Sequence, residues 1–356
     1  MFLAWNEIKH AKLRYSLVMG VMFLIAYLVF FLTGLAYGLA QDNRTAIDKW
    51  QADTILLSKE ANSNLNMSMI ARKELDNVDA KNKALLAQTP GVIVDNSSED
   101  NEKIDVSFFG IEADSFLAPK IVEGKMFASN DEVVADSSVK EQYGIKIGDE
   151  LSLSGNEKKL TVVGFTENAK FSVSPVLYTS INAFQEIRFE KEDTSENARI
   201  NGIVIRGPLA AYPDDLEKIS VGNFINDLPG YSAQVLTFGF MIGFLIVIAA
   251  IVIGIFVYVL TMQKQKIFGV MKAQGISSGY IAKSVIVQTF LLAFVGVVIG
   301  ALTSILTSFL LPAAVPYQNN YLFLIGVSIL MLLFAVSGAL FSVRTIVKID
   351  PLKAIG

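Results

Sequence analysis

The sequence contains no cysteine and only one histidine, His10. The absence of cysteine excludes thiolate metal sites and cysteine nucleophiles, and it fits a domain that folds without disulfides. His10 stands beside Lys9 and Lys12, where we expect an interfacial residue rather than a ligand. No serine in the long polar middle of the chain stands in a nucleophile-elbow context. We therefore expect neither a catalytic site nor a metal site.

The chain also lacks a nucleotide-binding motif, since no G-x-x-x-x-G-K-[ST] occurs in it. Any ATP chemistry must then come from a separate partner chain. No permanently bound cofactor and no nucleic-acid partner are expected.

Charge is scarce: 18% of the residues are charged, whereas soluble domains usually reach about a quarter. The deficit is local, because it lies in four uncharged apolar runs, residues 15–40, 231–263, 284–311 and 321–343. Each run reaches or exceeds the roughly 20 residues that a helix needs to cross a bilayer. The sequence therefore predicts an integral membrane protein with four transmembrane helices.

The missing charges within these runs also bear on mechanism. Ion-coupled transporters usually need ionisable groups inside the membrane, so an ion-driven antiporter is disfavoured. The first run is longer than the roughly 7–15-residue apolar core of a signal peptide. A retained span is therefore favoured over a cleaved leader, although Gly38-Leu39-Ala40 offers a small-x-small cleavage site.

The remaining charges set the orientation. Residues 1–14, 264–283 and 344–356 hold ten Lys and Arg against two acids, whereas residues 41–230 hold 20 basic and 32 acidic residues. Basic residues near span ends stay on the cytoplasmic side. We expect a multi-pass protein of the cell membrane with both termini cytoplasmic, a lead-in helix over 1–14, an outer loop over 312–320 and a tail over 344–356.

The outer block, residues 41–230, is long enough for a domain with its own core. Its patterns predict a compact α+β domain inserted between the first two spans. Strands are expected at residues 53–58, 91–95, 103–110, 132–136, 150–154 and 159–165, and helices at 67–88, 137–143, 181–188 and 213–219. Gly155-Asn156 is a hairpin turn signal between two of the strands.

Three spans carry Gly-x-x-x-Gly, at Gly34–Gly38, Gly239–Gly243 and Gly296–Gly300. Small residues at this spacing let helices approach closely in lipid. The pattern predicts tight helix packing, within the chain or across a dimer.

Between the second and third spans, the stretch MQKQKIFGVMKAQGISSGYI resembles the cytoplasmic loop of MacB/FtsX-type permeases, which belong to the ATP-binding-cassette superfamily. There an IGVLKAxGxS-like segment docks on the ATPase subunit. The residues that match or adjoin this segment are Ile267, Phe268, Gly269, Met271, Lys272, Ala273, Gly275 and Ser277. The C-terminal KIDPLKAIG matches the family ending at Asp350, Pro351, Ala354 and Ile355. The layout of spans and outer domain is also the family's.

The residues support docking independently. Apolar side chains at positions 267, 268, 270 and 271 lie between lysines, which predicts an amphipathic helix. Such a helix needs a protein groove or a lipid face to cover it. The resemblance favours the first, and it implies two copies of a separate ATPase on a permease homodimer.

Within this family, MFLAWNEIKHAKLRYSLV and FLTGLAYGLAQDN at the N-terminal end are similar to the haem-exporting, Hrt-type permeases of Gram-positive bacteria. This resemblance implies haem as substrate, entering from the membrane near the outer leaflet. Haem iron accepts His, Cys, Met or Tyr, so Tyr231 and Met241 are the ligand candidates. These two lie ten residues apart, about 15 Å along a helix, and pairing across a dimer or with Tyr178 is more plausible. Phe238 and Phe240 are candidates for stacking on the porphyrin or for lipid-facing packing.

The hypothesis is therefore a permease subunit that exports haem and confers haem tolerance. Two alternatives stay open. One is the same machine carrying an antimicrobial peptide or a lipoprotein, and the other is an FtsX-like signalling protein that controls a cell-wall hydrolase.

Overall fold

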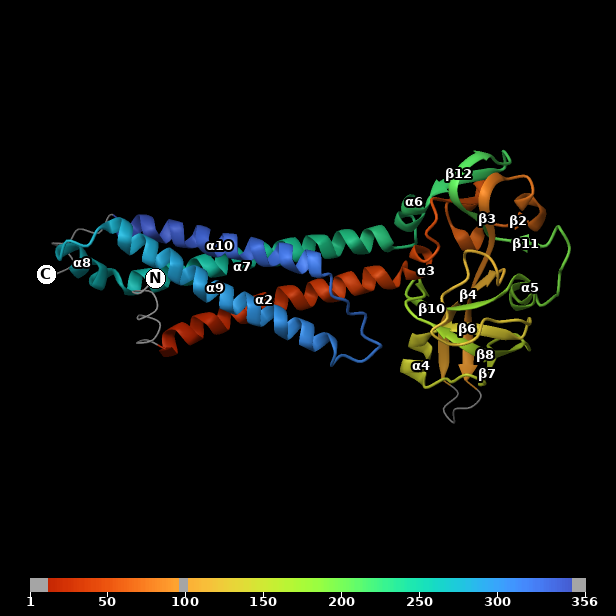
Figure 1. The fold of residues 1–356 in the computed structure, drawn as a ribbon, viewed down its shortest axis with the longest axis horizontal. Coiled ribbons are helices and arrows are strands. Elements are labelled where there is room, and N and C mark those ends of the chain that lie inside the picture. Colours follow the sequence, from red (N-terminus) through yellow and green to blue (C-terminus); the bar gives the residue numbers. More distant parts are fainter. Residues whose placement is uncertain (1–11, 96–101, 348–356) are drawn as a thin grey trace. The chain divides into compact units, whose positions relative to one another are not determined.

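Among the residues that the computed structural model describes, four helices are long and apolar enough to cross a membrane (Figure 1). They are α2 (Lys12–Asp42), α7 (Tyr231–Gln263), α9 (Ser278–Ser308) and α10 (Tyr321–Val347). They confirm the four predicted spans. The structure describes residues 12–95 and 102–347, so His10, the start of the lead-in helix and the C-terminal motif at 350–355 lie outside the described residues.

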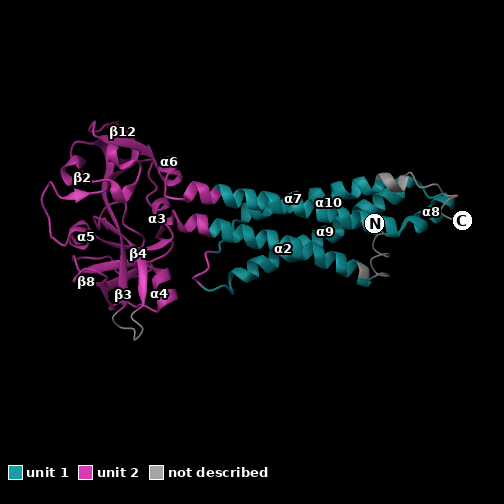
Figure 2. Cartoon of the chain, turned by 180° about the vertical axis from the view of Figure 1, so that it is seen from behind, with its two compact units in different colours: residues 1–38, 236–312, 317–356 teal, residues 39–235, 313–316 magenta. Residues whose placement is uncertain are grey.

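The chain divides into two compact units (Figure 2). Unit 1 consists of residues 1–38, 236–312 and 317–356 and contains most of the long helices. Unit 2 consists of residues 39–235 and 313–316 and contains the sheet. Both α2 and α7 have most of their length in unit 1 and their outer ends in unit 2.

Glycine allows a close helix contact in unit 1. A Cβ added to Gly296 of α9 would lie 2.7 Å from the Cβ of Met22 in α2, and one on Gly300 would lie 2.9 Å from the Cβ of Ala26. Real Cβ atoms do not approach this closely, so only glycine allows α9 to pack on α2 here. The Gly-x-x-x-Gly pattern of α9 therefore serves helix packing within the chain.

The other two pairs behave differently. Gly34 of α2 lies under the ring of Tyr317, whose carbons would be 2.5 Å from an added Cβ. Nothing lies within 4 Å of the corresponding point on Gly239 or Gly243 of α7. This side of α7 is therefore open in the single chain.

Unit 2 is built on one large mixed sheet (Figure 1). Its strands are β1 (Thr54–Ser58), β3 (Asp79–Asp95), β4 (Lys103–Ile111), β5 (Glu123–Gly124), β6 (Glu132–Asp136), β7 (Glu150–Leu153), β8 (Lys159–Thr166), β9 (Lys170–Phe171), β10 (Ser174–Ser180), β12 (Gly202–Ala211) and β13 (Leu216–Ser220). The main order is β13-β1-β12-β3-β4-β10-β6-β8-β5, with β7 paired to β3 and β8, and β9 paired to β10. Only the β10–β4 and β6–β8 pairs among these are parallel.

Short helices and a small second sheet complete the unit. The helices are α3 (Thr45–Asp48), α4 (Ser137–Tyr143), α5 (Ile181–Phe189) and α6 (Val221–Asn226), and β2 (Ile70–Ala71) pairs with β11 (Arg199–Ile200). The α+β class predicted for the outer domain is confirmed.

Two predicted helices are wrong. The stretch at 67–88 contains β2, a 3₁₀ turn at Arg72–Leu75 and, from Asp79, the first half of β3, which lies between β12 and β4. Residues 84–88 of β3 are all buried, so this part of the strand lacks the alternation of a half-buried strand, which explains the error. The stretch at 213–219 is a turn followed by β13, which pairs along β1 in antiparallel register. Sheet pairing there overrides the weak helix preference of Leu, Glu and Lys.

Candidate functional site

The cargo candidates lie mainly on α7. Tyr231 is its first residue, and its side chain is buried against the core of unit 2. The pKa of Arg44 is raised chiefly by its hydrogen bonds to Asp48, with a further hydrogen bond to Tyr231. The Tyr231 hydroxyl therefore already faces a guanidinium in this structure.

The other α7 candidates are more accessible. Phe238 and Met241 are half-buried, and Phe240 is exposed. Leu236, Phe244 and Val247 are exposed as well, so the outer half of α7 presents an apolar surface. An exposed apolar surface of this kind suits contact with lipid, an apolar ligand or a helix of a second copy.

Tyr178 is not available to a cargo. It lies on β10, is 1% exposed, and packs edge-on against Phe109 with ring centroids 5.8 Å apart. Burial, and to a lesser extent the charge of Asp136, raises the pKa of its hydroxyl. The structure does not bring Tyr178 together with Tyr231 or Met241 at one exposed site.

The predicted coupling segment forms a short helix and a turn. Helix α8 (Gln265–Ala273) is followed by its C-cap Gln274 and then by Gly275, whose φ of +88° favours glycine. The amide of Gly275 donates to the carbonyl of Lys272 and that of Ile276 to the carbonyl of Met271, which is the Schellman arrangement. Ser277 then caps α9, its hydroxyl accepting from the amide of Tyr280. In the family-like motif, Gly275 therefore terminates α8 and Ser277 begins α9 as its N-cap.

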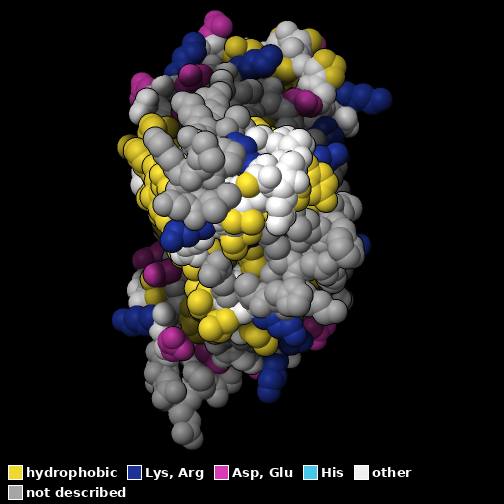
Figure 3. All heavy atoms as spheres, turned by 90° about the vertical axis from the view of Figure 1, so that its left-hand side faces the viewer, with side chains coloured by type: hydrophobic (Ala, Val, Ile, Leu, Met, Phe, Trp, Pro, Cys, Tyr) yellow, Lys and Arg dark blue, Asp and Glu magenta, His cyan; other side chains and the backbone are white. Residues whose placement is uncertain are grey.

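Helix α8 has two faces. Phe268 is only 2% exposed and packs with Ile281, Val285 and Val343, and Gly269 beside it is also buried. Ile267 on the opposite face is 56% exposed, and Val270 is also exposed. Figure 3 views this end of the molecule, where Lys and Arg side chains lie beside hydrophobic ones in the part that the structure describes. The exposed face is the one that a partner can reach.

The remaining coupling candidates surround this face. Met271 and Lys272 are half-buried, and Met271 packs at the edge of the Phe268 cluster. Ala273 and Gly275 are exposed. The family motif therefore mixes residues that hold α8 in place with residues that present its surface.

The sequence did not predict the side-chain contacts that hold the outer ends of α2 and α7 in unit 2. Lys170 of β9 donates to the carboxylate of Asp42 at 2.7 Å, and Asp42 is buried. Asn43 donates through Nδ2 to the carbonyl of Leu39 and, at 3.1 Å, to the Oε1 of Gln234 in α7. The sequence gives no signal for contacts this distant along the chain.

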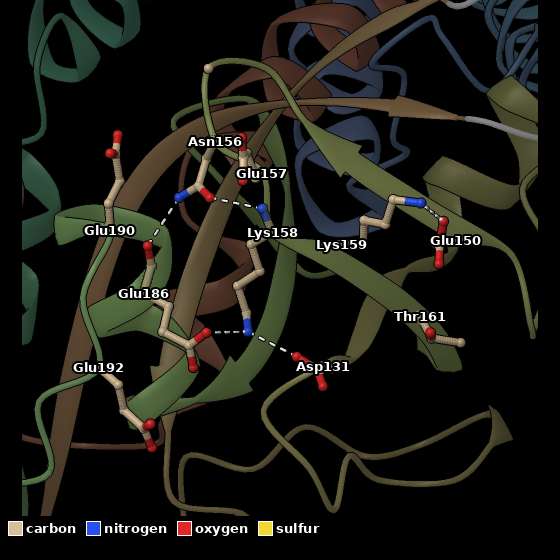
Figure 4. Close-up of a pocket in the computed structure, with 11 residues that line it drawn as sticks. Asp131, Glu150, Asn156, Glu157, Lys158, Lys159, Thr161, Glu186, Glu190 and Glu192 are labelled. Atoms are coloured by element: carbon tan, nitrogen blue, oxygen red, sulfur yellow. Dashed lines mark hydrogen bonds and ion pairs between the residues drawn. The ribbon is translucent and has the colours of Figure 1, made fainter.

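An open hollow of about 980 Å³ in unit 2 is lined mainly by acidic side chains (Figure 4). Lys158 lies at its centre, and its Nζ binds Glu186 at 2.7 Å and Asp131 at 2.9 Å. Glu190 and Glu192 point away from this pair. No group of three or more metal-ligating side chains occurs in residues 12–95 and 102–347. The cluster is an ion-paired surface.

Family models match nearly the whole chain. Residues 16–219 match the MacB-like periplasmic core domain, and residues 239–351 match the FtsX-like permease C-terminal domain. A relative from Staphylococcus epidermidis, named as a hemin transport system permease protein, HrtB, is 26% identical over all of this chain and 99% of its own. A protein of the same name from Staphylococcus haemolyticus is 24% identical with the same coverage. An uncharacterized ABC transporter permease of Mycobacterium tuberculosis is 23% identical, again over 99% of its length.

A solved extracellular domain, that of the noncanonic ABC-type transporter YknZ from Gram-positive bacteria, is 13% identical with a TM-score of 0.30 and covers 46% of this chain and 84% of its own. The two family models match in sequence order, the MacB-like core domain first and the FtsX-like C-terminal domain after it. The chain belongs to the ABC transporter permeases that combine a MacB-like core domain with an FtsX-like C-terminal domain, and it is a multi-pass membrane protein with a large extracellular domain.

Proposed function

We propose that the protein is the permease subunit of a haem exporter, which a separate ATPase drives and which confers haem tolerance. The observation that carries the proposal is the end-to-end match to relatives named as hemin transport permeases. Two permease chains, with both termini in the cytoplasm, would work with two copies of the ATPase.

The surface of α7 supports an apolar, membrane-dissolved cargo. Its exposed outer half, with Phe240 and Phe244, offers aromatic rings to a flat ligand, and the half-buried Met241 offers a thioether to the iron. Tyr231 stands at the start of the same helix, and its hydroxyl would have to leave Arg44 before binding iron. We expect haem to lie against this face, between two copies of the chain.

The exposed face of α8 supports coupling to the ATPase. Ile267 and Val270 offer an apolar contact, and the buried Phe268 anchors α8 to α9 and α10. A displacement of α8 is therefore passed to the spans. Because α2 and α7 end in unit 2, moving these spans also moves the extracellular domain.

Growth in haem tests the proposal. Cells that lack the gene should stop growing at a haem concentration that the parent tolerates. The wild-type gene should restore growth, and a gene for the Phe240→Asp, Phe244→Asp variant should not, although that protein still reaches the membrane. Leu322→Asp, which changes an even more exposed apolar residue at the outer end of α10, is the control and should restore growth. Equal sensitivity of the deletion strain and the parent would overturn haem as the cargo.

A further inference from the structure

One residue, Lys264, separates α7 from α8. Its backbone, at φ −98° and ψ 4°, interrupts the helical path. Its amide donates to the carbonyl of Thr261 at 3.1 Å, and its own carbonyl accepts from the amide of Phe268 at 3.0 Å. Lys264 is therefore the joint between a membrane span and the cytoplasmic helix.

The side chain of this joint is folded into unit 1. Lys264 is only 7% exposed. Its Nζ donates to the Oε1 of Gln288 in α9 at 3.0 Å and lies 5.2 Å from the centroid of the Tyr15 ring in α2. An ammonium only donates hydrogen bonds, so the oxygen of the Gln288 amide must face it. The ring of Tyr15 attracts the same charge through its π-electrons.

This placement is unusual for a lysine at the end of a span. Lysines there ordinarily extend the ammonium into water while the stem covers apolar surface. Lys266, two residues further on, is exposed in this way. Burying an ammonium costs solvation energy that an apolar side chain of equal length does not lose. Stability alone therefore gives no reason for a lysine at position 264.

We propose that Lys264 is a positioning residue for energy coupling. It holds the α7–α8 joint against both α2 and α9, so that a push on α8 moves three spans together instead of bending the joint. This inference rests on the proposed coupling of α8 to an ATPase. The apolar contacts of Phe268 fix α8 to α9 and α10, whereas the Lys264 side chain adds the connection to α2.

The test uses the full permease, co-purified with its ATPase and reconstituted in liposomes. ATP hydrolysis is measured with and without haem, and the thermal unfolding of the permease is measured in parallel. The variants are Lys264→Met, Lys264→Arg, Gln288→Leu and the double variant Lys264→Met, Gln288→Leu. Lys266→Met is the matched control, because it removes an exposed charge two residues away.

We expect Lys264→Met to bind the ATPase and to unfold at or above the wild-type temperature, while haem-stimulated hydrolysis falls about tenfold. Lys264→Arg should recover most of the stimulation, and Lys266→Met should match the wild type. Gln288→Leu should lower stimulation alone but add nothing to Lys264→Met, since both act through one contact.

Two results would overturn the inference. One is wild-type stimulation in Lys264→Met, and the other is a loss of stimulation that follows a matching loss of thermal stability, which a purely structural role predicts. A wild-type complex whose hydrolysis does not respond to haem would overturn the proposed function itself, and with it this inference.

Discussion

Two adjacent lysines of unit 2 differ in how much they stabilise it. The side chain of Lys158 is 8% exposed and binds both Glu186 and Asp131, whereas that of Lys159 is 58% exposed and binds only Glu150. Burial would lower the pKa of Lys158, but its two carboxylate partners outweigh burial and raise it. An exposed pair contributes little because water and salt screen it, so the two lysines should respond differently to the same substitution.

We predict that Lys158→Met destabilises unit 2 by about 1–3 kcal/mol, because it leaves the half-buried Glu186 without its cation. Lys159→Met should change stability by less than about 0.5 kcal/mol. The measurement is urea unfolding of the full chain in detergent, followed by the fluorescence of Trp50 in a Trp5→Phe background. Equal midpoints for the two variants would contradict the prediction.

The ion pairs of Lys158 with Glu186 and Asp131 also determine how the stability of unit 2 depends on pH. The pKa of Lys158 is raised above its ordinary value of 10.5, so the folded state holds this proton more tightly than the unfolded state. The stabilisation is complete below that ordinary value and is lost as pH rises through the folded value. Lys158→Met should therefore cost the most near neutral pH, and its effect should shrink in strongly alkaline solution.

At the scale of elements, the contact between α2 and α9 depends on glycine. We predict that Gly300→Leu lowers the thermal stability of the detergent-solubilised protein, by about 1–3 kcal/mol or more, because the new side chain meets Ala26 and the backbone of α2. Gly326→Leu in α10 is the control, since nothing lies within 4 Å of a Cβ there. Heating each variant and measuring the fraction that stays monodisperse gives the comparison. Similar curves for both would show that α9 tolerates displacement from α2.

The sequence identified elements well where one local signal decides the structure. The spans follow from length and apolarity, and the hairpin of β7 and β8 follows from Gly155-Asn156 between two alternating segments. The sequence-based prediction failed where pairing with a neighbouring strand decides the structure. The first half of β3 and all of β13 are strands because neighbouring strands pair with them, and no short window contains those neighbours.

The candidate site was predictable to the same extent. The family-like motif located α8, but the motif does not show that Phe268 faces inward and Ile267 outward, since that depends on contacts with α9 and α10. Tyr178 was a reasonable cargo candidate by chemistry alone. Its burial between β4 and β6 follows from a sheet order that joins segments far apart in sequence.

At the scale of the whole molecule, two helices connect the units. Helices α2 and α7 are continuous from unit 1 into unit 2, and their outer ends are joined by the Asn43–Gln234 hydrogen bond and held by the Asp42–Lys170 pair. A helix is stiff along its axis. Under the proposed coupling, work done on α8 would therefore reach the extracellular domain through α2 and α7, provided that the ATPase grips the exposed face of α8.

That condition gives the last prediction. Ile267→Glu together with Val270→Glu places two carboxylates on the exposed face of α8, and burying them under a partner without counter-charges is costly. Co-purification with the ATPase should fall about tenfold or more, while the permease itself unfolds as the wild type does, because neither side chain is buried. Val122→Glu, an equally exposed change in unit 2, should leave co-purification intact. Phe268→Glu should instead lower the stability of unit 1, since that ring lies inside it. If the double variant still bound its ATPase at full strength, α8 would not be the docking helix, and the force path from nucleotide to the extracellular domain would have to begin elsewhere.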